Sequence, residues 1–141
     1  MLRAGLLVAA SLGLAACAAG QAPATSASPQ QTGEVTTLDS TELAALIEAG
    51  KVILIDVRTP AEFAEARIPG SLLAPLDTFD PAAIPQEPGR ETILYCRSSA
   101  RSGRAAQLLA DYTGDPVRHL EGGLIAWQAE GLPVIPEPAD K

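Results

Sequence analysis

The sequence predicts an α/β protein built on an open, mostly parallel sheet with helices on both faces. Two runs, "KVILID" at 51–56 and "TILYC" at 92–96, are apolar with no polar alternation, which is typical of strands buried on both faces. Segments with helical periodicity alternate with the strand-like runs, and the connections between them are short. This alternation favours a parallel sheet.

The first helix and the strands beside it have clear boundary signals. A short strand is expected in "EVTTL" at 34–38. The helix after it starts at Asp39, which stands three residues before Glu42 as in a capping box, and Gly50 is its stop signal. The run at 51–56 then forms the next strand.

A second capping pattern follows in "RTPAEFAEARIPG" at 58–70. Thr59, Pro60 and Glu62 occupy the cap, first and third positions of a short helix, which ends before "IPG". "SLLAP" at 71–75 is a brief strand. The next segment, 76–91, is a proline-rich connection in which one helical turn is expected around 81–84.

The last third of the chain supplies a strand, a helix, a strand and a helix. "TILYC" leads into the helix "RSGRAAQLLADYTG", which Gly114 ends. We expect one face of this helix to pack on the sheet, formed by Ala105, Leu108, Leu109 and Tyr112. "PVRHL" at 116–120 is the final strand and "GGLIAWQAEG" at 122–131 the final helix.

Residues 1–16 are predicted to be an export signal. They have one charge, Arg3, then an apolar stretch too short to span a bilayer, and they end in small residues. The segment Leu14-Ala15-Ala16-Cys17 resembles the lipobox of bacterial lipoproteins, which implies cleavage before Cys17 and its acylation. An ordinary secretory signal with an incidental Cys17 is the alternative. The resemblance to lipoproteins also implies that Ala18, rather than Asp, after the lipidated cysteine favours the outer membrane, with the protein facing the periplasm.

Residues 17–34 are expected to form a flexible tether. They are rich in Ala, Ser, Thr, Pro and Gln and have no hydrophobic period, so they cannot bury enough surface to offset the entropy of ordering. A flexible coil of this length spans roughly 20 to 25 Å. The folded domain is then 35–136, and 137–141 is a C-terminal tail.

The charge and the cysteine count exclude several functions. The chain has 10 Lys and Arg against 17 Asp and Glu, and removal of the signal would take Arg3 away as well. This balance argues against nucleic acid as a partner. Two cysteines and one histidine cannot form a zinc site, so we expect no metal and no cofactor. If Cys17 is lipidated, Cys96 has no intramolecular partner.

The stretch "CRSSARS" at 96–102 is the candidate reactive site. It joins the end of a buried strand to a helix, where ligands bind in parallel sheets. A curled loop there would point several backbone N–H groups inward, and these together with the helix dipole would favour the thiolate of Cys96. Arg97 and Arg101 would add positive charge that cannot titrate away, and would attract an anionic substrate.

Two other interpretations of the cysteine and histidine stay open. Cys96 could be a buried structural thiol, although the polar residues after it argue against this. His119 lies on the predicted strand "PVRHL", where it is either structural or a group lining the pocket. A protease-like pair of Cys96 and His119 is the weaker inference, because no carboxylate is evident to orient the imidazole.

Several separated motifs resemble the single-domain rhodanese family of sulfurtransferases. They occur in order between about 35 and 135: Asp56-Val57-Arg58, Glu62-Phe63, Ile68-Pro69-Gly70, "CRSSARS", and Glu121-Gly122-Gly123 with Trp127. The resemblance implies a rhodanese-like sheet and a sulfurtransferase. Cys96 would take a sulfane sulfur from thiosulfate or a related anionic donor as a persulfide, and pass it to cyanide or a thiol acceptor.

The resemblance also implies roles for the loop residues. Arg97, Ser98, Ser99, Ala100 and Arg101 would bind substrate around Cys96. The chain departs from the family at Ser99, where many members have Gly, and at Arg67, where many have His. A glycine adopts left-handed angles at low cost, so Ser99 should reshape the loop or need a compensating hydrogen bond.

Some residues of these motifs are expected to be structural. Asp56 and Arg58 are read as an ion pair or hydrogen-bonded pair that pins the sheet edge to the neighbouring loop. Leu124, Ile125 and Trp127 are read as the core face of the last helix.

Two alternative functions remain at this point. One is a non-catalytic rhodanese-like module that binds a partner or senses persulfide. The other, weaker one is a cysteine phosphatase, which four residues between Cys96 and Arg101 disfavour because related phosphatase loops have five. We expect a monomer that the lipid anchor attaches to the membrane.

Overall fold

The computed structural model describes residues 33–136, and its α/β fold confirms the predicted class. The elements occur in the order β1 (Val35–Leu38), α1 (Ser40–Glu48), β2 (Val52–Asp56), α2 (Pro60–Glu65), β3 (Leu72–Leu73), η1 (Leu76–Thr78), η2 (Pro81–Ala83), β4 (Glu91–Tyr95), α3 (Ala100–Thr113), β5 (Val117–Leu120) and α4 (Gly123–Ala129). The 3₁₀ turn η2 lies where a helical turn was expected, and η1 was not predicted.

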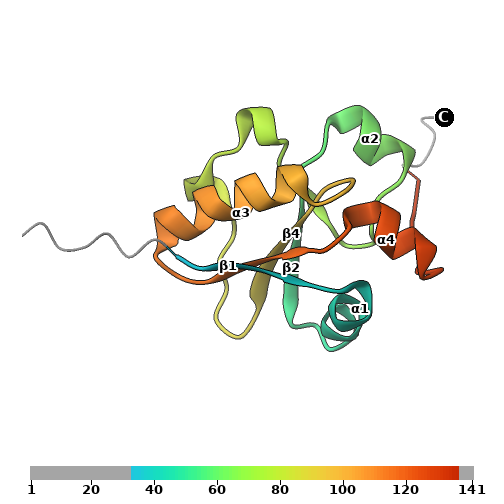
Figure 1. Cartoon of the computed structure of the whole chain (residues 1–141), viewed down its shortest axis with the longest axis horizontal. Coiled ribbons are helices and arrows are strands. Elements are labelled where there is room, and N and C mark those ends of the chain that lie inside the picture. Colours follow the sequence, from blue (N-terminus) through green and yellow to red (C-terminus); the bar gives the residue numbers. More distant parts are fainter. Residues whose placement is uncertain (1–32, 137–141) are drawn as a thin grey trace, which may run out of the picture.

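The five strands form one sheet in the order β1-β5-β4-β2-β3, and every neighbouring pair is parallel. Helix α3 lies on one side of the sheet and α1 and α4 on the other (Figure 1). Two buried apolar clusters fill the two interfaces. The sheet is therefore covered on both faces, as the uninterrupted apolar runs predicted.

Strand β4 shows how the sheet contributes to both cores. Ile93 and Tyr95 belong to the cluster under α1 and α4, whereas Leu94 and Cys96 belong to the cluster under α3. Alternate residues of a strand point to opposite faces. Cys96 therefore extends from the end of β4 toward α3.

The caps expected at Asp39 and Thr59 are present, but only the second is a complete capping box. The Asp39 side chain accepts a hydrogen bond from the Glu42 amide, while the Glu42 carboxylate pairs with Arg118 rather than completing a capping box. The box at Thr59 and Glu62 is complete. Gly114 ends α3 in the left-handed conformation.

The predicted packing face of α3 was wrong in part. Leu108 is 47% exposed and Tyr112 62% exposed, although Ala105 and Leu109 are buried as expected. The stripe that contacts the sheet is completed by Ala106 and Ala110. Small side chains let the helix approach the sheet closely, and a pattern weighted toward large apolar residues missed them.

Four predicted features lie outside the described residues: the export signal 1–16, the lipidation of Cys17, most of the tether 17–34 and the tail 137–141. At the start of the described part, the Glu34 carbonyl accepts a hydrogen bond from the Val117 amide. No helix between residues 33 and 136 is long and apolar enough to cross a membrane.

Candidate active site

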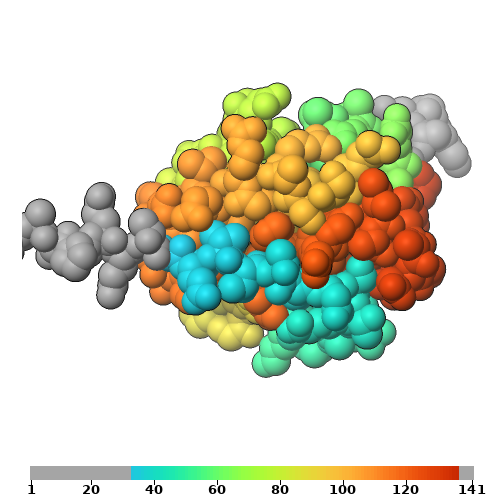
Figure 2. Space-filling model, viewed as in Figure 1, coloured from blue at the N-terminus to red at the C-terminus, as the bar shows by residue number. Residues whose placement is uncertain are grey.

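The loop that carries Cys96 lies at the C-terminal end of β4, between that strand and the start of α3. In the space-filling view its residues adjoin α2 on one side and α4 on the other (Figure 2). This is the edge of a parallel sheet where strands end and helices begin, the usual place for a ligand site. The predicted location of the site agrees with this arrangement.

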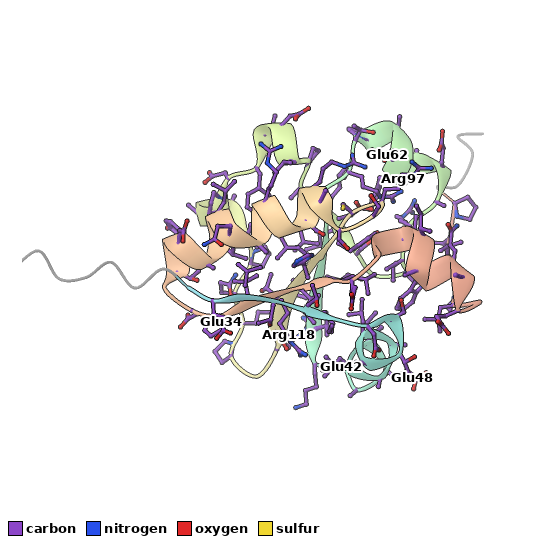
Figure 3. All side chains as sticks on the ribbon, in the orientation of Figure 1. Glu34, Glu42, Glu48, Glu62, Arg97 and Arg118 are labelled. Carbon is purple, nitrogen blue, oxygen red and sulfur yellow. The ribbon has the colours of Figure 1, made fainter. Side chains whose placement is uncertain are left out.

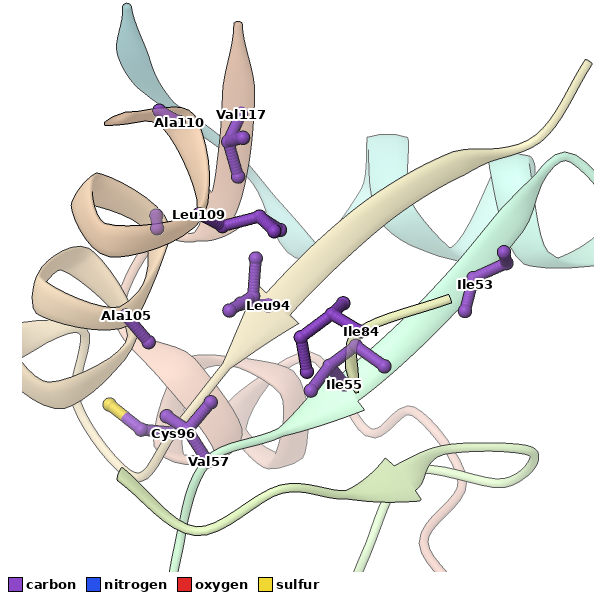
Figure 4. Close-up of a cluster of buried hydrophobic side chains, with 11 residues drawn as sticks. Ile53, Ile55, Val57, Ile84, Leu94, Cys96, Ala105, Leu109, Ala110 and Val117 are labelled. Atoms are coloured by element: carbon purple, nitrogen blue, oxygen red, sulfur yellow. The ribbon is translucent and has the colours of Figure 1, made fainter. Parts of the chain in front are cut away.

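Cys96 itself is 1% exposed and packs against the apolar cluster on the α3 side of the sheet. Its sulfur points away from Val57 and toward the first turn of α3 (Figure 4). The carbon part of the residue is thus part of the core, while the sulfur faces the loop.

Donors from the loop stabilise the thiolate. Burial raises the pKa of Cys96, since it disfavours the charged form. Hydrogen bonds outweigh burial and lower the pKa overall; the donors are the Ser102 hydroxyl and the backbone amides of Ser102, Ser98 and Arg101. Three backbone amides, those of Ser98, Arg101 and Ser102, thus act on the sulfur together with one hydroxyl.

Ser99 adopts a backbone angle that serine rarely takes. Its φ is +83° and its ψ is −37°, and it has the only positive φ of a non-glycine residue in the described part of the chain. Its hydroxyl accepts a hydrogen bond from the Gly122 amide at 2.6 Å and donates one to the Leu120 carbonyl at 3.2 Å. These are the compensating hydrogen bonds that a serine at this position was expected to need.

The start of α4 holds the loop from the other side. The Leu124 amide donates to the Cys96 carbonyl at 2.8 Å, and the Ile125 amide donates to the Arg97 carbonyl at 3.1 Å. A Cβ added to Gly123, whose φ is +58°, would lie 2.5 Å from the Cys96 carbonyl oxygen. Only glycine allows this approach. The carbonyls of Cys96 and Arg97 therefore face α4, whereas the later amides of the loop act on the sulfur.

Arg101 has a partner that the sequence did not reveal. Its guanidinium makes two hydrogen bonds of 2.7 Å to the carboxylate of Glu62, in α2. The hydrogen bond from Arg101 is the main reason that the pKa of Glu62 falls to about 2. The charge of Arg101 is thus largely compensated, and its amide is the group that contributes to lowering the pKa of Cys96.

Arg97 is a loop residue with an exposed side chain, which lies near Glu62 (Figure 3). Among residues 33–136 it forms no ion pair. It lines a cavity of about 220 Å³ between α2 and α4, together with Arg58, Glu62, Glu65, Ala66, Leu124, Ile125 and Gln128. Ile125 is 49% exposed and so is not the core residue that was expected, unlike Leu124 and Trp127.

Ser102 is a residue of the candidate site whose contacts the sequence did not reveal. It has no exposed surface, and its hydroxyl lies 3.1 Å from Nδ1 of His119. His119 is buried, and burial lowers the pKa of its imidazole, an effect that the Glu121 carboxylate partly offsets. A serine directly after the loop arginine was the available signal, but its partner is 17 residues away.

Asp56 and Arg58 form the buried ion pair that the motif suggested. The Arg58 guanidinium binds the Asp56 carboxylate, with its shortest contact at 2.6 Å, and also donates to the Ala66 carbonyl. The side chains are 0% and 4% exposed. The pair fixes the end of β2 to the chain after α2. Arg67 packs over the Phe63 ring, 4.7 Å from its centroid.

A parallel α/β sheet that carries a buried cysteine at a strand end, with a loop that lowers the pKa of the thiol, is the class of protein that the fold and the site define. Residues 39–130 match the family model described as the rhodanese-like domain. The chain therefore belongs to the rhodanese-like family.

Similar proteins support this assignment. An uncharacterised Synechocystis protein is 44% identical over 93 residues, which are 66% of this chain and 52% of that protein, so the chain spans about half its length. A protein of Allochromatium vinosum named sulfurtransferase is 39% identical over 104 residues, 72% of this chain and 95% of the relative. A solved structure from Rhodopseudomonas palustris, described as a possible tyrosine phosphatase, has a TM-score of 0.62 at 30% identity and covers 72% of this chain and 85% of its own.

Proposed function

We propose that this protein is a sulfurtransferase that moves a sulfane sulfur from thiosulfate, or a related anionic donor, to cyanide or a thiol through a persulfide on Cys96. The observation that carries the proposal is the buried Cys96 sulfur at the end of β4, which points toward the first turn of α3 and whose pKa the donors of the loop lower. A thiolate is the form that attacks sulfur. The name of the Allochromatium relative supports the same reaction class.

The proposed reaction has two balanced steps. The Cys96 thiolate attacks the outer sulfur of thiosulfate; a sulfur–sulfur bond forms to Cys96, and the bond to the sulfonate group breaks with its electron pair leaving on sulfite. In the second step cyanide attacks the terminal sulfur of the persulfide. Thiocyanate leaves and the Cys96 thiolate is restored, so no oxidant, reductant or cofactor is consumed.

The loop is suited to both charged states of this cycle. The terminal sulfur of a persulfide is anionic and would take the place of the thiolate charge within reach of the amides of Ser98, Arg101 and Ser102. Arg97 has no carboxylate partner among the described residues, so its guanidinium is free to attract a dianionic donor. Arg101 is expected to contribute mainly through its backbone.

The alternatives make different predictions from the same loop. A phosphatase must bind a phosphate group, and related phosphatase loops have five residues between the cysteine and the arginine. This loop has four residues between Cys96 and Arg101, and the Arg101 guanidinium is held by Glu62, so both features disfavour phosphate. A non-catalytic module would keep the fold without sulfur turnover. We therefore rank sulfur transfer first.

Intact mass measurement of the full chain tests the proposal. Thiosulfate should add one sulfur atom to the protein, and cyanide should then remove it with formation of thiocyanate. Cys96→Ser should abolish the gain, whereas Cys17→Ser, which alters the other cysteine of the chain, should not. No gain with thiosulfate, polysulfide or glutathione persulfide would overturn the proposal, as would rapid hydrolysis of p-nitrophenyl phosphate that depends on Cys96.

We also propose that the domain is anchored through a lipid on Cys17 and faces the periplasm. The lipobox-like sequence before Cys17 supports this. Cells fed an alkyne fatty acid should label the wild type and not Cys17→Ala. Equal labelling of both proteins would contradict the anchor.

A further inference from the structure

The hydroxyl of Ser102 has one proton and three candidate acceptors. It donates to the Ser99 carbonyl oxygen at 3.0 Å and lies 3.1 Å from Nδ1 of His119. The third candidate acceptor is the Cys96 sulfur, which points toward this turn of α3 and whose pKa the Ser102 hydroxyl lowers. A hydroxyl donates one hydrogen bond and accepts up to two. Since Ser102 has no exposed surface, these neighbours decide where its proton points.

The ring of His119 is held where it can make that decision. His119 lies in β5, is 8% exposed, and has its Cε1 and Nε2 atoms beside Gly103 of α3. Burial keeps the imidazole neutral at pH 7, because it lowers the pKa further than the Glu121 carboxylate raises it. A neutral imidazole carries its proton on one nitrogen only.

The two tautomers of His119 have opposite effects on Cys96. With the proton on Nε2, Nδ1 is an acceptor and competes with the sulfur for the Ser102 proton. With the proton on Nδ1, the imidazole donates to the Ser102 oxygen, and the hydroxyl proton is free to bind the thiolate. A thiolate is a charged acceptor and so forms the stronger hydrogen bond, which couples the second tautomer to ionisation of Cys96.

We propose that His119 is a positioning residue for Cys96: it donates from Nδ1 to the Ser102 hydroxyl and thereby directs the hydroxyl proton onto the sulfur. His119 takes no proton from the thiol and forms no bond to substrate. When the sulfur of Cys96 loses its charge, the same hydroxyl can turn to the Ser99 carbonyl, 3.0 Å away. This role of His119 concerns the same site as the proposed function. Only the use of the role in sulfur transfer rests on that function.

The tautomer can be read directly, because His119 is the only histidine of the chain. The two ring nitrogens of ¹⁵N-histidine-labelled full chain should give separate signals in a long-range ¹H–¹⁵N spectrum. We expect the Nδ1–H tautomer at a pH at which Cys96 is ionised. An Nε2–H tautomer under that condition would overturn the inference, and this measurement needs no variant that could fail to fold.

A mutant cycle gives a second test in the full chain carrying Cys17→Ser, where Cys96 is the only thiol. The pKa of Cys96 is followed by the pH dependence of its alkylation rate. Ser102→Ala should raise this pKa by about one unit, a tenfold change in the thiolate ratio, and His119→Leu by about half a unit. The double variant should not exceed Ser102→Ala, since His119 acts only through Ser102.

Two controls separate positioning from a structural role. His119→Asn, whose amide can donate from near the Nδ1 position, should keep the pKa of Cys96 near the wild-type value. Arg118→Leu disturbs the neighbouring position of β5 and removes ion pairs to Glu42 and Glu91, and should lower stability without moving that pKa. Additive effects in the double variant, or an unchanged pKa in His119→Leu, would overturn the inference. Neither readout needs a sulfur donor, so the result is separate from the test of sulfur transfer.

Discussion

Ser99 combines a strained backbone with hydrogen bonds that offset the strain. A φ of +83° lies in the region that glycine occupies freely, and holding another residue there costs on the order of 1 to 3 kcal/mol. The two hydrogen bonds of its hydroxyl, to Gly122 and Leu120, contribute about 1 kcal/mol each. The two effects are similar in size and opposite in sign.

Two substitutions at this position separate the effects. Ser99→Ala keeps the strain and loses both hydrogen bonds, so it should lower the free energy of unfolding by about 2 kcal/mol. Ser99→Gly loses the same bonds but relieves the strain, so it should remain within about 1 kcal/mol of wild type. The glycine variant should therefore be the more stable of the two, by about 1 to 3 kcal/mol.

Urea unfolding of the full chain can measure this, followed by the fluorescence of Trp127, the only tryptophan, which is 2% exposed. Ser98 is the matched control, because it lies in the same loop with an exposed side chain and without positive φ. There the alanine variant should be at least as stable as the glycine variant. If Ser99→Ala proved as stable as Ser99→Gly, the backbone angle would carry no cost and the reasoning would fail.

Three further changes test other contacts of the site. Gly123→Ala should destabilise the fold by about 2 kcal/mol or more and raise the pKa of Cys96, because its Cβ would meet the Cys96 and Arg97 backbone. Gly50→Ala is the control, since Gly50 also has a positive φ, +65°, but open space around it. This variant should cost only about 1 kcal/mol and leave the pKa of Cys96 unchanged. Glu62, whose pKa is depressed from 4.5 to about 2, contributes stability that is complete above pH 4.5 and lost as the pH falls through 2. Glu62→Gln should remove about 1 to 2 kcal/mol of that pH dependence in acid titrations, a range that allows for the partial exposure of both side chains. Asp56→Asn leaves the buried Arg58 unpaired and should cost about 3 kcal/mol in urea unfolding; a loss below about 1 kcal/mol would contradict the importance of the pair.

The sequence was sufficient for most of the fold because its signals are local. The uninterrupted apolar run that became β2 is buried at every position, and the caps at Asp39 and Thr59 are formed within three residues. Such interactions can be read along the chain without a tertiary structure. The exposed Leu108 and Tyr112 show the limit of this approach, since which side of a helix faces a sheet depends on the packing of its small residues as well.

The site was predictable in position but not in its connections. A cysteine between a buried strand and a helix identified the loop, and the expected inward amides follow from that junction. The ion pair of Arg101 joins it to a residue 39 positions earlier, and the hydroxyl of Ser99 reaches 21 positions ahead to Leu120. No local pattern encodes contacts of that range. The Arg101 guanidinium was therefore expected to act on the thiol, whereas in the structure it binds the Glu62 carboxylate of α2.

These connections change which physical effect sets the reactivity of Cys96. The arginines of the loop suggested a long-range field, but one is paired with Glu62, and the donors on the sulfur are short-range N–H and O–H groups. Their direction depends on the backbone, which Gly123 and Ser99 hold in place from two sides. The side chains at 98 and 100 are exposed, so substitutions there should leave the donors in place, whereas changes at 99, 102 and 123 should alter the orientation of the donors themselves. Salt screens the interaction between exposed charges far more than it weakens hydrogen bonds to a buried sulfur. The pKa of Cys96, followed by its alkylation rate, should therefore depend little on ionic strength.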